Sequence, residues 1–456
     1  MNTELPLPKT YYKFFLAGSL LAATLHGSEA AAQDLSSIGT RLAANHQATQ
    51  LAISAKDTAP SQTISLADRI VMASRLYADI QSYFGHWKAI PGYDFDQEYS
   101  RYINEVIASD DRRAFDLSSM KFLATLQNGH SSFSDKWLND TFGQRIGFYA
   151  YPIDGDWVVT QSTIADLHRG EVITAIDGEP FDSFYEKNRK YISASSERWR
   201  RHSFFEESYL FPATFTITLK GGRQLTVTRH DPYQWIGAQY KSIETSQTDG
   251  IAILRIPVFI PQDFEDSAVE YLRKLGPVKA LILDVRGNHG GSTPGALVEA
   301  LMERPYRWMA ESTAVTLALF RATDRIGAHT ELSWSSDPQP PSPHPLYSGP
   351  LFILIDGGCL SACETMIAPF KDNHRAVILG EPTGGSTGQP YYHSFGNGMK
   401  FQLSTKREYL PDGSPFEGVG IAPDTEVHAS AADLRNGNDP VMAMALKLSS
   451  QAVDNK

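Results

Sequence analysis

Hydrophobic and polar positions alternate with a helical period in the first third of the chain. Apolar side chains recur three or four residues apart over residues 70–83, 99–107 and 120–126, and the last set ends just before Gly129-His130. Residues at this spacing lie on one face of an α-helix, so each set predicts an amphipathic helix. We expect these helices to form a domain over residues 63–143.

The pattern then changes to short segments separated by glycine turns. Residues 149–151 and 157–159 flank a turn at Gly155-Asp156, and 169–180 contains a strand closed by an Asp-Gly turn. A further pair, 215–219 and 224–228, flanks Gly221-Gly222. Alternating runs around such turns are typical of β-hairpins. We expect a small, mostly β module over residues 144–236.

From residue 250 onward, continuous apolar runs alternate with helical patterns. Continuous apolar runs are typical of strands buried on both faces, and their alternation with helices favours a largely parallel sheet. We therefore expect an α/β core over residues 237–430 and a C-terminal helix over 431–456. The predicted strands are 251–256, 280–284 and 351–356, and the predicted helices are 268–275, 294–302 and a helix that starts at Ser361.

The N-terminal segment has the three parts of a secretory signal peptide. Lys9 and Lys13 precede a short apolar run, and Ala30-Ala31-Ala32 closes the segment. The run is shorter than the roughly 20 residues that cross a bilayer, although an uncleaved membrane anchor is the alternative. We expect a signal peptide over residues 1–32, export to the periplasm or the medium, and no stable membrane span after its removal. Residues 33–62, rich in Ala, Ser, Thr and Gln, would then be a linker.

Composition narrows the possible partners. The 456 residues carry 41 Lys and Arg against 52 Asp and Glu, a net charge of −11 without basic blocks. This balance argues against nucleic acid as a partner. Two cysteines exclude a disulfide framework and a Cys-rich zinc site, and no His-Glu-x-x-His motif is present. We expect no metal and no other cofactor.

Two predicted core strands end in glycine-rich turns that lead into helices. The turns are Asp-Val-Arg-Gly-Asn-His-Gly-Gly at 284–291 and Asp-Gly-Gly-Cys-Leu-Ser at 356–361. Ligands gather at this end of parallel strands, where helix N-termini offer free N–H groups. Such donors suit a phosphate, a carboxylate or a developing oxyanion. Neither turn has the spacing of a dinucleotide or phosphate loop, which disfavours nucleotides.

Ser361 has two interpretations. Ser361-Ala362-Cys363-Glu364 fits a capping box, which is a purely structural role. A serine at a helix start can also attack a carbonyl while neighbouring N–H groups bind the oxyanion. The attack needs a base, for which His130 is the first candidate and His289 and His393 are competitors.

The two cysteines flank this serine. Cys359 and Cys363 stand four residues apart across a helix start, so a disulfide between them would be strained. We interpret both as small packing residues. A catalytic thiol is the alternative, although neither cysteine has a better-placed base than Ser361 has.

In this order, the motifs resemble those of the C-terminal processing (tail-specific) peptidases and their tricorn-core and retinoid-binding-protein-like relatives. The likeness runs from about Leu66 to the C-terminus and includes both glycine turns and the segments 376–385 and 411–424. Residues 169–180 are similar to a PDZ core strand. The resemblance implies an α/β catalytic core with a mostly parallel, ClpP/crotonase-like sheet, an N-terminal helical domain and a PDZ-like module.

The resemblance also implies a catalytic set. One branch of the family activates its serine with a lysine after the glycine turn, where this chain has Ser386. The other branch uses a histidine in an Asp-Gly-His-Ser motif, oriented by a glutamate. This chain resembles the second branch, with Asn128 in place of that Asp. The implied set is Ser361 as nucleophile, His130 as base and Glu417 as orienting acid.

Further residues of the site follow from the same resemblance. The oxyanion donors would be the N–H groups of Ala362 and of the Gly290-Gly291 turn. Ser131 is a further candidate for the network around the histidine. Glu364 is either a helix cap or a further site residue.

The expected function is a serine-type peptidase that hydrolyses protein or peptide substrates by acyl transfer. A neutral imidazole is required, so activity should rise with pH through roughly 6–7. The first alternative is an inactive relative that binds peptides or a hydrophobic ligand in the same cleft. The second is hydrolysis of another acyl bond such as an ester, for which the usual Gly-x-Ser-x-Gly elbow is missing.

Overall fold

The computed structural model describes residues 61–231, 242–260, 263–315 and 330–454, which belong to one compact unit, Ala59–Lys456. The predicted signal peptide and nearly all of the predicted linker lie outside the described residues. Among the described helices, none combines the length and the apolar character that a membrane span requires.

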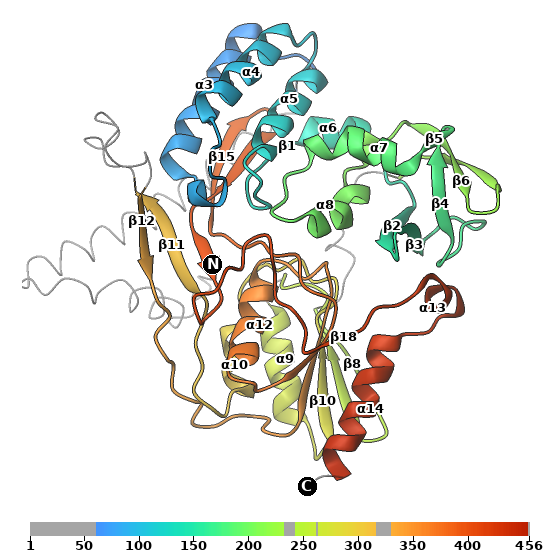
Figure 1. Cartoon of the computed structure of the whole chain (residues 1–456), viewed down its shortest axis with the longest axis vertical. Helices are drawn as coiled ribbons and strands as arrows, with labels where there is room; N and C mark the ends of the chain where they lie inside the picture. Colours follow the sequence, from blue (N-terminus) through green and yellow to red (C-terminus); the bar gives the residue numbers. More distant parts are fainter. Residues whose placement is uncertain (1–60, 232–241, 261–262, 316–329, 455–456) are drawn as a thin grey trace, which may run out of the picture. The chain divides into compact units, whose positions relative to one another are not determined.

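Three helices open the described chain and pack side by side in Figure 1. They confirm the helices predicted from the apolar period. Each follows a Ser or Asp whose side chain accepts a hydrogen bond from the first turn, which satisfies a free backbone donor. The helices are α3 (Leu66–Tyr83), α4 (Phe95–Ala108) and α5 (Arg112–Ala124).

The mostly β module is an antiparallel sheet with the strand order β2-β3-β4-β6-β7, and β5 pairs with β4. Both predicted hairpins are present. The helices α7 (Phe181–Asn188) and α8 (Glu197–Ser203), which lie between β5 and β6, were not predicted. The strands are β2 (Phe148–Ile153), β3 (Asp156–Ser162), β4 (Val172–Ile176), β5 (Glu179–Pro180), β6 (Thr214–Leu219) and β7 (Gln224–Thr228).

The core sheet has the order β18-β14-β13-β10-β9-β8, and every neighbouring pair is parallel except β8 with β9. The predicted strands and helices of the core are all found within a few residues of their expected bounds. The strands are β8 (Glu244–Thr248), β9 (Ile251–Arg255), β10 (Ala280–Asp284), β13 (Leu351–Ile355), β14 (Val377–Gly380) and β18 (Thr425–Glu426). The helices are α9 (Asp263–Lys274), α10 (Gly295–Leu301) and α12 (Ala362–Asp372).

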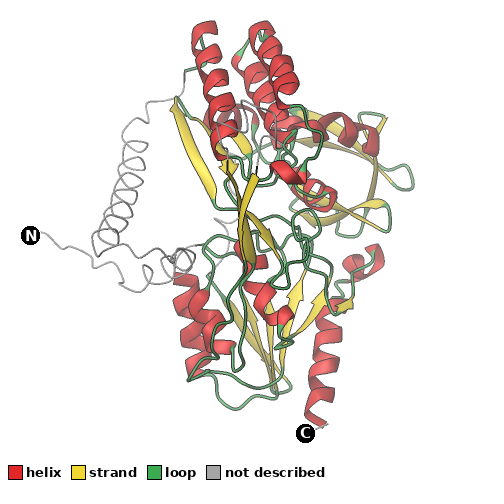
Figure 2. Ribbon diagram, turned by 60° about the vertical axis from the view of Figure 1, so that its left-hand side comes forward, coloured by secondary structure: helices red, strands yellow, loops and turns green. Residues whose placement is uncertain are grey.

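Both faces of this sheet are covered, which explains the continuous apolar runs. Leu281, Leu283 and Ile353 share a hydrophobic cluster with α9, α10 and α12. The alternate residues Ile282 and Leu354 pack instead with the C-terminal helix α14 (Pro440–Asp454). Figure 2 shows this arrangement, with helices on either side of the yellow strands. Every residue of β10 and β13 is buried.

Two small sheets, absent from the sequence expectations, join distant segments. In one, β1 (Ser132–Asp135) pairs antiparallel with β16 (Met399–Ser404), which pairs with β15 (Pro390–Gly396). In the other, β11 (Ala310–Val315) lies between β12 (Thr330–Trp334) and β17 (Arg407–Tyr409). Because β1 directly follows the loop that contains His130, its pairing with β16 holds this loop beside the core.

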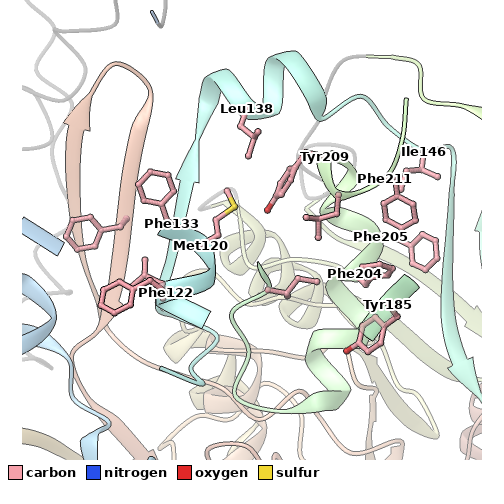
Figure 3. Close-up of a cluster of buried hydrophobic side chains, with 14 of the residues drawn as sticks. Met120, Phe122, Phe133, Leu138, Ile146, Tyr185, Phe204, Phe205, Tyr209 and Phe211 are labelled. Carbon is pink, nitrogen blue, oxygen red and sulfur yellow. The ribbon is translucent and has the colours of Figure 1, made fainter. Parts of the chain in front are cut away.

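One hydrophobic cluster crosses the expected boundary between the helical domain and the β module. Figure 3 shows Met120 and Phe122 of α5, Phe133 of β1, and Tyr185 and Phe204 of the module as parts of this cluster. The two segments therefore share a core. Short elements that line this junction are α6 (Lys136–Phe142) and the 3₁₀ turns η2 (Arg189–Tyr191), η3 (Phe204–Glu206) and η4 (Ser208–Leu210); a further turn, η1 (Trp87–Ala89), follows α3.

The prediction of one C-terminal helix over 431–456 is wrong, because two helices occupy the described part of this range. The helix α13 (Ala431–Asn436) ends at Gly437, whose φ of 72° is left-handed and therefore suits glycine. Asp439 then begins α14 by accepting a hydrogen bond from Met442 N–H at 2.9 Å. Pro440, with its fixed φ, suits the first helical position.

The buried ion pair between Arg112 and Asp135 yields a stability prediction. Arg112 Nε and Nη2 donate to the two carboxylate oxygens at 2.6 and 2.7 Å, and both side chains are 0% exposed. Arg112→Met should lower the free energy of unfolding by about 3–5 kcal/mol, because it leaves a buried carboxylate without its partner. Urea titration followed by circular dichroism measures this loss.

The matched control is Arg101→Met, which removes an exposed pair with Glu98. This change should cost less than about 1 kcal/mol. Equal losses in the two variants would contradict the account of the Arg112 pair.

Candidate active site

Ser361 stands at the sharp turn between β13 and α12. Its φ of 59° and ψ of −126° are unusual for a residue with a side chain, and such strain is typical of functional sites. The Gly290 backbone approaches this turn so closely that a Cβ at Gly290 would lie 2.9 Å from the Ala362 nitrogen. The two glycine-rich turns, which were expected to supply the oxyanion donors together, are therefore in contact.

His130 faces this serine. The Nε2 atom of His130 lies 2.9 Å from Ser361 Oγ, and His130 is only 9% exposed. The backbone N–H of His130 donates to Asn128 Oδ1 at 3.0 Å, which fixes the loop between α5 and β1. The structure thus brings the predicted nucleophile and the predicted base within hydrogen-bonding distance of each other.

Glu417 is connected to His130 through an intervening hydroxyl. His130 Nδ1 lies 3.0 Å from Ser386 Oγ, and Ser386 donates to Glu417 Oε1 at 3.0 Å. Glu417 also accepts hydrogen bonds from Asn128 Nδ2 at 3.0 Å and from Thr387 N–H at 3.3 Å. The glutamate therefore lies in the expected place, but Ser386 stands between it and the imidazole.

Two members of this network were missed or undervalued in the sequence. In the sequence, Ser386 stands out only as the residue at the position where one branch of the family has its lysine. This position was the only indication that Ser386 could belong to the site. Asn128 was noted as a departure from the family's Asp, and its amide donates to the Glu417 carboxylate. A carboxylate at position 128 would instead place two acceptors against each other.

The Glu364 carboxylate joins the nucleophile turn to the Ser386 turn. Its Oε2 accepts from Ser361 N–H at 3.2 Å and from Ser386 N–H at 3.0 Å. Its Oε1 accepts from Gly385 N–H at 2.7 Å and from the Thr383 hydroxyl. Burial raises the pKa of Glu364 to about 8, and the hydrogen bonds from Thr383, Gly385 and Ser386 oppose this rise. The expected cap contact is present, and the carboxylate also holds a second loop.

The oxyanion donors need one correction. Gly290 N–H donates to Asn288 Oδ1 at 2.8 Å, so it is not available to a substrate. Within the described residues, the N–H groups of Ala362 and Gly291 have no acceptor. The Gly290-Gly291 turn therefore offers one free donor, that of Gly291, beside the donor of Ala362.

The remaining sequence candidates lie outside the serine–histidine contact. Ser131 donates to Asn128 Oδ1 at 3.0 Å and accepts from Ser404 N–H at 3.1 Å, so it fixes the loop. His289 packs edge-on against Trp199. His393 is on β15, where its Nδ1 lies 3.4 Å from the Tyr391 hydroxyl.

Both cysteines are free and buried. Cys359 Sγ lies 3.1 Å from the carbonyl oxygen of Val285. Burial raises the pKa of both thiols, which disfavours the thiolate that a nucleophilic cysteine needs. Within the described residues, no group of three or more His, Cys, Asp or Glu side chains could hold a metal ion.

Burial moves the pKa values of His130 and Glu417, the predicted base and acid, in opposite directions. It lowers the pKa of His130 to about 4, although the charge of Glu408 opposes this change. It raises the pKa of Glu417 to about 7, opposed by hydrogen bonds from Ser195, Ser386 and Thr387. The lowered pKa keeps His130 neutral at neutral pH, as a general base must be, and within the chain His130–Ser386–Glu417 the pKa that lies near neutrality is that of Glu417.

Comparison with known proteins relates these residues to a family. Residues 250–427 match the model of peptidase family S41. The carboxy-terminal-processing protease of Bartonella bacilliformis is 24% identical over 204 residues, which cover 44% of this chain and 44% of the relative. The chloroplastic carboxyl-terminal-processing peptidase 2 of Arabidopsis thaliana is 29% identical over 161 residues, 34% of this chain and 27% of the relative. The chain thus spans less than half the length of either curated relative.

A solved structure extends the similarity of the fold beyond the matched residues. Mature CPAF in complex with lactacystin superimposes with a TM-score of 0.66 and 15% identity, covering 86% of this chain and 99% of that chain. At this identity the similarity shows a shared fold, which includes the helical part and the β module as well as the core.

The Ser361–His130 contact predicts a reactive serine. A fluorophosphonate should form a covalent bond to Ser361 Oγ, because the neutral imidazole accepts the proton that the hydroxyl loses. His130→Ala should slow this labelling by about 10²–10⁴-fold, and intact-protein mass spectrometry measures the rate.

His393→Ala serves as the control, since this competing histidine lies on β15, and it should leave the rate unchanged. Labelling of a different residue, or equal rates in the two variants, would refute the assignment of the base.

Proposed function

We propose that the chain, whose residues 250–427 match the model of peptidase family S41, is a serine peptidase acting on peptide bonds through an acyl-enzyme at Ser361. The match agrees with the resemblance inferred from the ordered motifs. The observation that carries the proposal is the 2.9 Å contact between Ser361 Oγ and His130 Nε2. A hydrogen bond between nucleophile and base is the geometry that covalent catalysis needs.

In the first half of the reaction, Ser361 Oγ attacks the carbonyl carbon of the scissile bond. Its proton moves to His130 Nε2 as the new C–O bond forms, and the carbonyl oxygen becomes an oxyanion. The N–H groups of Ala362 and Gly291 donate to this oxyanion. The C–N bond then breaks, and the proton on His130 passes to the leaving amine.

The second half repeats these steps with water. Water gives a proton to His130 Nε2 and attacks the acyl carbon, and the ester bond to Ser361 breaks as the proton returns to its oxygen. In both halves, the Nδ1–H of His130 donates to Ser386, whose hydroxyl donates to Glu417. The glutamate thereby stabilises the transient imidazolium through one intervening serine.

We also propose finer features of the fold and location. The core is ClpP/crotonase-like, which its run of five parallel strands supports. The β module is PDZ-like, with β2 as the edge strand that a peptide could extend in a PDZ domain. The N-terminal signal pattern supports export, and proteins or peptides are the proposed substrates.

An inactive binding protein is the weaker candidate. A chain that had lost catalysis would be free to lose the geometry of the nucleophile and its base. Here Ser361, His130, Ser386 and Glu417 form a continuous chain of hydrogen bonds.

The proposal is tested by hydrolysis of an unbiased peptide library. The wild-type protein should cleave members of the library, and Ser361→Ala should lower kcat on the order of 10⁶-fold. The loss of the cap interaction should cost only about 1 kcal/mol of stability, so the variant remains folded.

Ser430→Ala is the matched control. Ser430 also caps a helix and accepts a hydrogen bond from Asp433 N–H at 3.1 Å, but it belongs to α13. This variant should lose comparable stability and keep its activity. Cleavage that persists in Ser361→Ala would show that the nucleophile is a different residue.

The pKa values predict how activity depends on pH. The active form combines neutral His130 with ionised Glu417, and the pKa of Glu417 is raised to about 7. We therefore expect kcat/KM to rise with pH with a midpoint near 7. This midpoint is close to the rise in activity that the sequence predicts through roughly pH 6–7, but we assign it to Glu417 instead of His130.

Glu417→Gln tests this assignment. An amide can donate to Ser386 and reverse its hydroxyl, which would leave the imidazole in the wrong tautomer. We expect kcat to fall by on the order of 10⁴-fold and the midpoint near pH 7 to disappear. A variant that keeps this midpoint would exclude Glu417 as its origin.

A further inference from the structure

Ser195 contacts the catalytic network from a part of the chain outside the core. Its Oγ lies 2.9 Å from Ser386 Oγ and donates to Glu417 Oε1. It also accepts a hydrogen bond at 2.9 Å from the backbone N–H of Gly129, the residue before His130. The Ser195 hydroxyl therefore contacts Ser386, Glu417 and the loop that contains His130.

The segment that carries Ser195 is fastened to the loops of the site. It joins η2 to α8, and Ser196 Oγ donates to the carbonyl oxygen of Gly384 at 2.6 Å. Arg198 Nη1 donates to the carbonyl oxygens of Thr383 at 2.5 Å and Val419 at 3.3 Å. Thr383 and Gly384 precede Ser386 and Val419 follows Glu417, so the segment of Ser195 is fastened to the loops of both residues.

Apolar contacts hold the same segment against the nucleophile turn. Ala194 and Trp199 form a small buried cluster with Leu360, the residue before Ser361. The Ser195 carbonyl oxygen also lies close to Gly418, where an added Cβ would come within 2.9 Å of it. Ser195 is thus placed by packing on both sides, and its hydroxyl has a fixed set of partners.

We propose that Ser195 is a positioning residue of the peptidase reaction, which holds the Glu417 carboxylate and the Ser386 hydroxyl in the arrangement that orients His130. This inference rests on the proposed function. Ser386 has a single hydroxyl proton, which must point to Glu417 if Ser386 is to accept from His130 Nδ1. Ser195 is a third donor to Glu417 Oε1, beside Ser386 and Asn128, and helps to hold that oxygen in place. The hydrogen bond from Gly129 N–H holds the Ser195 hydroxyl itself.

The charged groups around Glu417 make this donor important. Burial raises the pKa of Glu417, the negative charge of Glu408 adds to this rise, and Lys406 pairs with Glu408 at 2.7 Å. The other titratable groups nearby are Glu364, whose pKa is raised mainly by burial and also by the charge of Glu417, and His130 with the buried His86. Since burial and the Glu408 charge both disfavour ionised Glu417, its ionised form depends on neutral donors such as Ser195.

The test compares pH profiles of kcat/KM for the wild type and Ser195→Ala. Loss of one hydrogen bond to the ionised carboxylate should move the midpoint upward by about one pH unit. We also expect kcat to fall about tenfold while KM stays unchanged, because Ser195 does not contact the substrate. Ser203→Ala, a change in the adjoining helix α8 at a buried serine that donates to the Arg200 carbonyl oxygen, should leave both the midpoint and kcat unchanged.

A second pair of variants separates the hydroxyl from the fold. Ser195→Thr and Ser195→Val have nearly equal volume and differ in the hydroxyl. Threonine should restore the wild-type midpoint, and valine should reproduce the upward shift. If the wild type is active, Ser361→Ala is inactive and the threonine and valine variants share one midpoint, the inference about Ser195 is wrong while the proposed function stands. If Ser361→Ala retains activity, the proposed function itself fails.

Discussion

The Glu364 carboxylate accepts hydrogen bonds from the backbone of Ser361, from the backbone of Gly385 and Ser386, and from Thr383. The Glu364 side chain is fully buried, so no water molecule can replace it as the acceptor of these hydrogen bonds. This one side chain sets the separation of two loops, one with the nucleophile and one with the relay serine. The imidazole of His130 fits between them and reaches Ser361 Oγ at 2.9 Å and Ser386 Oγ at 3.0 Å. The geometry of the proposed reaction therefore depends on a residue that does not contact the substrate.

Besides the loops of Ser361 and Ser386, the site contains segments that the small sheets and α8 hold in place. The pairing of β1 with β16 fixes the His130 loop, and the segment before α8 places Ser195 between this loop and Glu417. The helical part and the β module share a hydrophobic cluster, so the loop of the base and the segment with Ser195 rest on one core. The residues of the proposed site are thus distributed over the chain, although the family match covers residues 250–427.

The sequence predicts the parts of this structure that depend on local pattern. The strands β10 and β13 were recognisable because burial on both faces requires continuous apolar runs, and the three first helices because one face is apolar. The relay through Ser386 was not predictable, since it depends on hydrogen bonds between residues far apart in the chain. The same reason applies to Ser195 and to the Gly290 N–H, whose partner Asn288 is set by the folded turn. The break at Gly437 had a visible signal in the run Gly-Asn-Asp-Pro at 437–440, but the helical period of the surrounding residues suggested one continuous helix.

The central claim is that resting His130 accepts from Ser361 through Nε2 and donates through Nδ1–H to Ser386. Nitrogen-15 NMR of histidine-labelled protein, with His130→Gln used to assign the signal, measures this tautomer directly. At pH 8 the account predicts a protonated Nδ1 and an unprotonated Nε2. A protonated Nε2, or an imidazolium at this pH, would contradict it, because neither form can take the proton from Ser361.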